Sequence, residues 1–245
     1  MQGHPKSPLL IGLVSHAPGS GKSTIADHLV EGHGFIVLPF AGPLKRICLE
    51  VLASAGLSED NARRYTYHDK EAVIPELGVT ARYLQQTLGT DWGRRLINPN
   101  LWIDAWAHQC RTICSAIDTP PARIVVDDVR FPNEADCVTA LGGQLWEIRR
   151  PGHNPRRSLP RWVPDRTLNL LPRSLRSRLH VSEGQLVGRR DFSRGIVNDG
   201  SVEQLHALID VIALGGWRRT GCISYARPQV SRAASAILHA PLQQS

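Results

Sequence analysis

The sequence predicts an α/β protein of three layers, with helices on both faces of a central, mostly parallel five-stranded sheet. An unbroken apolar run, Leu9–Val14, leads through a Gly-rich turn into a helix-like segment. A second apolar run, Phe35–Leu38, follows after a short joint, and strand, helix and strand in this order form a βαβ unit. Apolar runs without alternation are typical of parallel strands buried on both faces. Three later runs supply the other strands, at 123–128, 145–148 and 195–197.

The turn after the first strand has the residue pattern of a phosphate-binding loop. Its backbone N–H groups and the following helix N-terminus favour an anion. Lys22 would reach the β- and γ-phosphates of a nucleoside triphosphate, and Ser23 would offer its hydroxyl to Mg²⁺. His16 stands where the pattern has its first glycine. A plain Gly-rich turn is the alternative, and the residues predicted to bind nucleotide are Gly19, Ser20, Gly21, Lys22, Ser23 and Thr24.

The first helix carries apolar residues at helical spacing and ends near Gly32–Gly34, which suits a helix C-cap. Beyond the second strand, the pattern predicts helices at 44–55, 80–88 and 101–117, with a polar segment at 58–70. Because the whole block 41–118 separates two strands, we expect it to be an α-helical insertion.

The third strand ends in two carboxylates, Asp127 and Asp128. Asn133 is expected to cap the next helix, which runs to Leu141. After the last strand, Ser201 and Gln204 form a capping box. The helix that follows has an apolar stripe and is expected to close at Gly215-Gly216.

Charge divides the chain into unequal parts. The net charge is +7, but residues 149–178 carry +8 and residues 216–245 carry +4, so the remainder sums to −5. We therefore expect a flexible leader at 1–8, one domain at 9–214 and a basic, disordered tail at 215–245. An acidic body makes nucleic acid an unlikely partner unless the two basic segments build the binding face.

No apolar run reaches the length of a membrane span, which predicts a soluble, cytoplasmic protein without a membrane partner. The five cysteines are odd in number and lack zinc-knuckle spacing, so reduced thiols are expected. The histidines at 16, 108 and 180 lack ligand spacing and predict no metal site. Trp92, Trp102, Trp106 and Trp146 are expected in the core rather than as base-stacking platforms.

Charged groups gather at the carboxyl edge of the predicted sheet, where open α/β sheets bind ligands. A carboxylate at the end of the third strand can hold Mg²⁺, and strand parity alone does not choose between Asp127 and Asp128. Arg130 can grip a phosphate from the same edge, or it can be a solvated arginine. The Arg-rich segment 149–185 can fold over a triphosphate as a lid, although a solvated basic loop is the plain alternative.

The chain resembles the phage-type deoxynucleoside monophosphate kinases, a branch of the adenylate-kinase-like phosphate-loop kinases. The most specific match is Asp128-Val-Arg-Phe-Pro-Asn-Glu134, and the matches run in order over residues 9–214. Gly42 departs from the family, which often has an acidic residue there. The matching stretches are 16–24, 40–45, 84–94, 101–102, 128–136, 141–143, 180–183 and 196–201.

The resemblance implies transfer of the ATP γ-phosphate to a deoxynucleoside 5′-monophosphate, giving a diphosphate for dNTP synthesis. It implies Mg²⁺ as cofactor, favours Asp128 over Asp127 as its ligand with Ser23, and implies host cytoplasm for a phage-encoded protein. The block 41–118 would bind the acceptor, and 149–185 would be the lid. The implied catalytic residues are Lys22, Asp128 and Arg130, the acceptor residues are Arg94, Arg130, Asn133 and Glu134, and those near the ATP base are Asn198, Asp199 and Gly200.

Three alternatives stay open at this stage. The acceptor can be another small phosphate compound, such as dephospho-coenzyme A. The two basic segments can belong to an NTPase coupled to DNA, and a loop of this kind can also serve a non-catalytic scaffold. Base preference, sugar preference and oligomeric state, including a homodimer, are not readable from the sequence.

Overall fold

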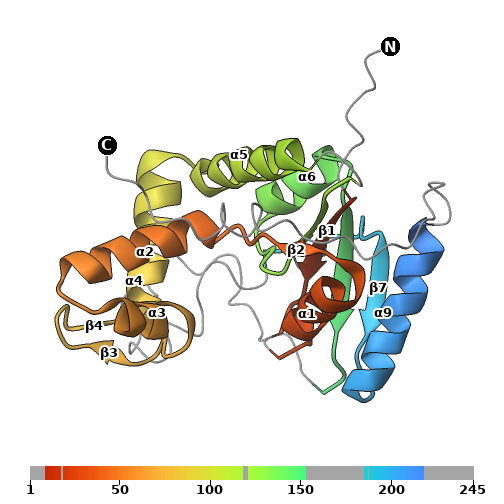
Figure 1. Ribbon diagram of the computed structural model, residues 1–245, viewed down its shortest axis with the longest axis horizontal. Coiled ribbons are helices and arrows are strands. Elements are labelled where there is room, and N and C mark those ends of the chain that lie inside the picture. The colour runs from red at the N-terminus through yellow and green to blue at the C-terminus, as the bar shows by residue number, and fades with distance from the viewer. Residues whose placement is uncertain (1–8, 18, 118–120, 153–184, 187, 218–245) are drawn as a thin grey trace, which may run out of the picture.

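Five parallel strands form the centre of the molecule in the computed structural model, which describes residues 9–17, 19–117, 121–152, 185–186 and 188–217 (Figure 1). The strand order is β2-β5-β1-β6-β7, and every neighbouring pair runs parallel. β1 is therefore central, with β5 and β6 on its two sides. The strands are β1 Leu9–Val14, β2 Ile36–Val37, β5 Arg123–Val126, β6 Gln144–Arg149 and β7 Arg194–Val197.

Helices cover both faces of the sheet. α5 (Leu101–Ala116) and α6 (Pro132–Ala140) pack on one face, against Leu10 and Val14 of β1. α1 (Lys22–His33) and α9 (Val202–Trp217) pack on the other, against Ile11 and Leu13. Since successive strand residues face opposite sides, one apolar run supplies both cores. This is the predicted three-layer α/β architecture.

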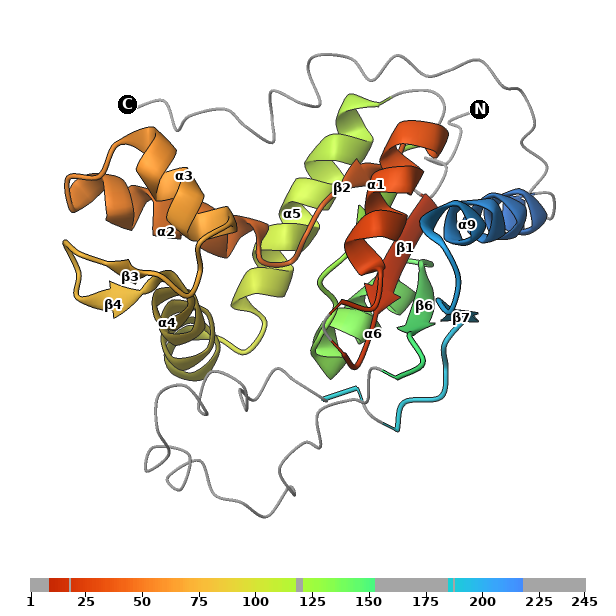
Figure 2. The same ribbon diagram turned by 90° about the horizontal axis from the view of Figure 1, so that it is seen from below.

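The insertion between β2 and β5 forms a lobe beside the sheet, and both views show it at the end of the molecule opposite α9 (Figures 1 and 2). Buried apolar side chains give the lobe its own small core around Leu52, Tyr65 and Ile74. Its elements before α5 are α2 Gly42–Ser54, α3 Glu59–Tyr67, β3 Val73–Ile74, β4 Val79–Thr80, α4 Ala81–Gln86 and the π-helix Thr87–Ile97.

The structure corrects five local expectations. Trp92, expected in the core, is 41% exposed. The polar segment at 58–70 contains α3, which Ser58 caps by accepting a hydrogen bond from the Asn61 N–H. The insertion is not purely helical, because β3 and β4 pair as an antiparallel hairpin. Asn133 lies inside α6 rather than at its cap. α9 continues to Trp217, beyond the expected stop at Gly215-Gly216.

The other expected strands and helices are confirmed to within a few residues. The leader 1–8, the tail beyond 217 and all but the ends of the lid segment 149–185 lie outside the described residues. Within the part of the chain that the structure describes, no helix is both long enough and apolar enough to cross a membrane.

Trp106 is the largest side chain of the core under α5, where it is fully buried and its Nε1–H donates to the Leu38 carbonyl at 2.8 Å. We expect Trp106→Ala to lower the free energy of unfolding by about 3–5 kcal/mol, because it opens a cavity and leaves that carbonyl unpaired. Urea denaturation measures the loss. Leu96→Ala is the control, since Leu96 is 76% exposed and its loss should stay within about 0.5 kcal/mol. Equal losses in the two variants would contradict the packing described.

Candidate active site

The loop between β1 and α1 has the backbone form that its glycines predict. Gly19 and Gly21 have φ of 69° and 102°, a region that favours glycine. A Cβ on Gly21 would lie 2.5 Å from the Asn198 Nδ2, so no side chain fits there. Ser20 is only 2% exposed, and its Oγ has no hydrogen-bond partner within the described residues. The loop therefore forms a backbone cradle, and the buried Ser20 hydroxyl remains able to bond a ligand.

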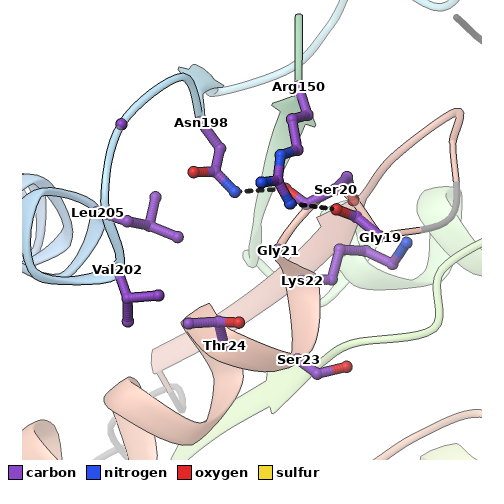
Figure 3. A pocket seen from close by; sticks show the side chains of 11 residues that line it. Gly19, Ser20, Gly21, Lys22, Ser23, Thr24, Arg150, Asn198, Val202 and Leu205 are labelled. Atoms are coloured by element: carbon purple, nitrogen blue, oxygen red, sulfur yellow. Dashed lines mark hydrogen bonds between the residues drawn. The ribbon is translucent and has the colours of Figure 1, made fainter. Parts of the chain in front are cut away.

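A pocket of about 270 Å³ opens over this cradle (Figure 3). All six residues predicted for the loop line it, and the far wall comes from the segments after β6 and β7 and from the start of α9. Asn198 and Gly200 are among these, as predicted, whereas Asp199 is exposed and does not line the pocket. The remaining lining residues are Arg150, Val202 and Leu205.

Two side chains fasten the far wall to the loop. The Asn198 Nδ2 donates to the Ser20 carbonyl at 2.9 Å, and Asn198 is itself buried. The Arg150 guanidinium donates to the Gly19 carbonyl at 3.2 Å (Figure 3). Both bonds use loop carbonyls, so neither of them occupies a loop N–H group. Arg150 also belongs to the predicted lid, 149–185, and it contacts the loop.

His16, the irregular residue of the loop pattern, has a partner in the neighbouring strand. Its Nε2 lies 3.2 Å from the Oε1 of Glu147, which is buried on β6. The other Glu147 oxygen accepts from Arg149 at 2.7 Å. No residue other than glycine has a positive φ among those described, so this position does not need glycine here. His16 instead ties the start of the loop to β6.

The two carboxylates after β5 have different partners. Both oxygens of Asp128 accept backbone hydrogen bonds, from Phe40 N–H at 2.8 Å and Ala41 N–H at 2.9 Å. Asp128 therefore fixes the turn that leads into α2. Burial and the neighbouring Asp128 raise the pKa of the Asp127 carboxyl, while Lys45 and Lys22 act to lower it. Asp127 thus interacts electrostatically with the lysine of the loop and with a lysine of the insertion.

Lys70 interacts electrostatically with Asp127 and with three cations from other segments. Burial lowers the pKa of the Lys70 ammonium, and repulsion from Lys45, Arg82 and Arg130 lowers it further. Asp127 acts in the opposite direction. Lys45 also lies over the Tyr67 ring, with its Nζ 5.0 Å from the centroid. We call Lys45, Lys70, Arg82 and Arg130 the cationic cluster, in which Arg82 also pairs with Glu71. An anion bound beside Lys70 would offset the repulsion that the other three charges exert on it.

Glu134 organises the segment that carries Arg130. Its Oε2 accepts from the N–H groups of Arg130 and Phe131 at 2.8 and 3.0 Å, and its Oε1 accepts from the Arg94 guanidinium. Arg94 also stacks on the Phe131 ring at 4.0 Å. Asn133 donates to Asn100 at 2.9 Å. Glu134 and Asn133 are predicted to bind the acceptor. In the structure, both side chains make hydrogen bonds to other residues of the protein.

Four candidate site residues are not among those predicted from the sequence, namely Lys45, Lys70, Arg82 and Arg150. One signal could have found the lysines, because the chain has only four lysines beside 25 arginines. Three of the four, Lys22, Lys45 and Lys70, interact electrostatically with Asp127. Arg82 lacks such a signal, since only the fold brings α4 to this point.

Comparison with known proteins now decides the family. A protein of Acanthamoeba polyphaga mimivirus named “Putative deoxynucleotide monophosphate kinase” is 38% identical over 207 residues, which cover 82% of this chain and 94% of that protein. The chain belongs to the deoxynucleotide monophosphate kinase family. Membership supports a kinase, that is, a phosphotransferase, and agrees with a phosphate-binding loop at the end of β1.

Two solved structures resemble this kinase-family chain only distantly. One is a “putative kinase” of Chloroflexus aurantiacus, with 15% identity, coverage of 86% of this chain and 98% of that chain, and a TM-score of 0.37. The other is a sugar kinase of Janibacter sp., with 14% identity, coverage of 87% and 96%, and a TM-score of 0.35. Likenesses this weak carry no argument about the substrate. The chain matches no protein-family model.

Glu134 generates a testable pH dependence. Burial raises the pKa of this carboxyl to about 7, although Arg94 acts to lower it. The folded state therefore holds a proton that the unfolded chain has released, and the stability from Glu134 is full below the ordinary pKa and is lost as pH rises toward 7. We expect the free energy of unfolding to fall by up to about 1.4 kcal/mol per pH unit between about pH 5 and 7.

Urea denaturation at a series of pH values measures this slope, with Glu134→Gln as the comparison. The amide cannot titrate, so its slope in the same window should be smaller by that amount. Parallel curves for the wild type and Glu134→Gln would show that Glu134 does not titrate there.

Proposed function

We propose that the chain transfers the γ-phosphoryl group of ATP to a deoxynucleoside 5′-monophosphate, giving ADP and a deoxynucleoside diphosphate. The observation that carries this proposal is the pocket over the phosphate loop, whose lining includes Lys22 and Ser23. Asp127, which follows the neighbouring strand, interacts electrostatically with Lys22 and with Lys45 and Lys70 of the insertion, and this supports a second anion site beside the loop. Family membership agrees with this reading, because the mimivirus relative is named for that activity.

The donor half of the site is the cradle at the start of α1. The loop N–H groups and the unpartnered Ser20 hydroxyl would hold the β-phosphate, and Lys22 would contact the β- and γ-phosphates. Thr24, Asn198 and Gly200 line the rest of the pocket toward the ATP base. Arg150 is placed to move from the Gly19 carbonyl to a phosphate oxygen.

The residues present suit Mg²⁺, which prefers oxygen ligands. Ser23 offers a hydroxyl in the pocket, and Asp127 offers a carboxylate directly after the neighbouring strand β5. We infer Asp127 as the metal-side carboxylate in place of Asp128, because both Asp128 oxygens already hold the turn before α2. Bound Mg²⁺ would neutralise charge that develops on the phosphates.

The acceptor half is the cationic cluster. A monophosphate placed there would relieve the repulsion that lowers the Lys70 pKa, so its binding energy comes partly from removing strain between like charges. Arg130 can contact the phosphate with its fork of donors. Arg94 and Glu134 support Arg130 indirectly. Glu134 fixes the backbone of Arg130 and also accepts a hydrogen bond from Arg94. We therefore propose that Arg94, Asn133 and Glu134 position the segment that carries Arg130 and do not bind the acceptor themselves.

The transfer needs little covalent help from the protein. An oxygen of the acceptor phosphate attacks the γ-phosphorus, the bond from that phosphorus to the β–γ bridging oxygen breaks, and ADP leaves with the electron pair. A phosphate dianion has no proton to lose at this step, so no general base is required. Lys22 and the cationic cluster hold the two anions in line and offset their repulsion, which is the main source of rate in phosphoryl transfer.

An acceptor screen tests this function. Purified full-length chain is mixed with Mg-ATP and, in turn, each dNMP, the matching NMPs and dephospho-coenzyme A, and the products are separated by ion-exchange chromatography. We expect equimolar ADP and dNDP with at least one dNMP. ADP without any dNDP, or product from dephospho-coenzyme A alone, would contradict the proposal. ATP hydrolysis that requires added DNA would indicate a DNA-coupled NTPase instead.

The two halves should separate in steady-state kinetics. We expect Lys22→Ala to lower kcat by roughly 100-fold or more, because a phosphate contact made in the transition state is lost. Lys70→Ala and Arg130→Ala should raise the KM of the acceptor by roughly tenfold or more, since each removes a charged contact, while the KM of ATP changes little. Arg63→Ala is the control, because this exposed arginine of α3 pairs with Glu59. A KM effect on ATP alone would place the cationic cluster on the donor.

A further inference from the structure

A second cluster of chemically active side chains lies away from the phosphate loop, between α1 and α9. We propose that His28 and His33 of α1 and Asp210 of α9 form a binding site for a borderline transition-metal cation such as Zn²⁺. This proposal does not depend on the proposed function, because none of the three residues lines the pocket over the loop.

The three side chains converge on one point. The Nε2 atoms of His28 and His33 each lie 2.7 Å from the same oxygen of Asp210, Oδ1. The three ligand atoms all lie within 4.8 Å of one another. The side chains of His28 and His33 are only 16% and 11% exposed, while Asp210 is 44% exposed. The cluster is therefore sheltered on the histidine side and open on the carboxylate side, which gives a cation a way in.

The donor set suits Zn²⁺ better than Mg²⁺. Two imidazole nitrogens and one carboxylate oxygen are ligands of Zn²⁺, Co²⁺ and Ni²⁺, whereas Mg²⁺ takes oxygen ligands. Bonds of about 2.0–2.2 Å in a tetrahedron separate ligand atoms by about 3.4 Å. The present 2.7 Å contacts need to open by only a fraction of an ångström, which side-chain rotation allows. Three protein ligands leave the fourth position to water.

A neighbouring imidazole holds one of the ligands in place. His206 stacks on the His28 ring, with centroids 4.0 Å apart and planes 12° from parallel. The stack fixes the orientation of the His28 ring, which a preformed site needs.

The location links the site to the nucleotide pocket mechanically. His28 and His33 lie on the second half of α1, the end away from Lys22. α9 begins beside the pocket with Val202 and Leu205. The two helices lie side by side in both views (Figures 1 and 2). A cation bound by both would pin α9, and with it the far wall of the pocket, against the helix that carries the loop.

Metal titration of the full-length, tag-free chain tests this. After treatment with a chelator, ZnCl₂ is added without nucleotide, and binding is followed by calorimetry and by thermal unfolding. We expect one Zn²⁺ per chain and a rise in Tm of about 5 °C or more at a hundredfold excess over Kd. CoCl₂ should give visible absorption bands typical of mixed nitrogen and oxygen ligands. A tenfold excess of MgCl₂ should not displace either ion.

Variants assign the site. Asp210→Asn and His28→Gln should each lower the affinity for Zn²⁺ by at least tenfold and cut the rise in Tm at the same Zn²⁺ concentration by about half or more. Both keep side-chain polarity so that folding is retained. His108→Gln is the control, since His108 is an exposed histidine of α5 outside the cluster. No stoichiometric binding by the wild type would overturn the proposal. Unchanged affinity in both Asp210→Asn and His28→Gln would also overturn it, because the ion would then bind elsewhere, for example at the cysteine thiols of α5.

Discussion

The parallel pairing of β1 with β5 is the constraint on which the rest of the site depends. Gly12 of β1 lies opposite Val126 of β5, so both strands end at the same edge. The phosphate loop leaves from one strand and Asp127 from the other. Because parallel strands deliver their following loops to one edge, residues more than a hundred positions apart become neighbours. The insertion and the segments after β6 and β7 are then folded around that edge.

The use of lysine at this edge has a physical reason. An ammonium is a compact point charge whose pKa shifts readily, whereas a guanidinium keeps its charge and binds through a planar fork. Three of the four lysines interact with Asp127, while arginine supplies nearly all the positive charge elsewhere. The proposed transfer brings two polyanions together and therefore needs dense charge in little space. The lysines would supply it, and Arg130 and Arg150 would add directional contacts.

The sheet and the loop were predictable because their signals are local. Apolar runs gave the strands, and the glycines around Lys22 gave the cradle. The cationic cluster was not predictable in the same way, because Lys45, Lys70 and Arg82 lie on separate elements of the insertion and meet only through its packing. His16 shows the same limit, since its partner Glu147 lies on another strand. The resemblance favoured Asp128 as the metal-side carboxylate. The sequence does not reveal that two backbone N–H groups donate hydrogen bonds to the oxygens of Asp128, because these contacts depend on the fold.

The most direct measurement compares Asp127→Asn with Asp128→Asn, by kcat with saturating Mg-ATP and acceptor and by Tm without ligands. If Asp127 stands between donor and acceptor, its amide variant loses roughly 100-fold or more in kcat and keeps its Tm. The Asp128 variant should lose Tm, because an amide has one oxygen where the carboxylate holds two N–H groups. Full activity in Asp127→Asn, or loss of kcat at unchanged Tm in Asp128→Asn alone, would contradict this arrangement.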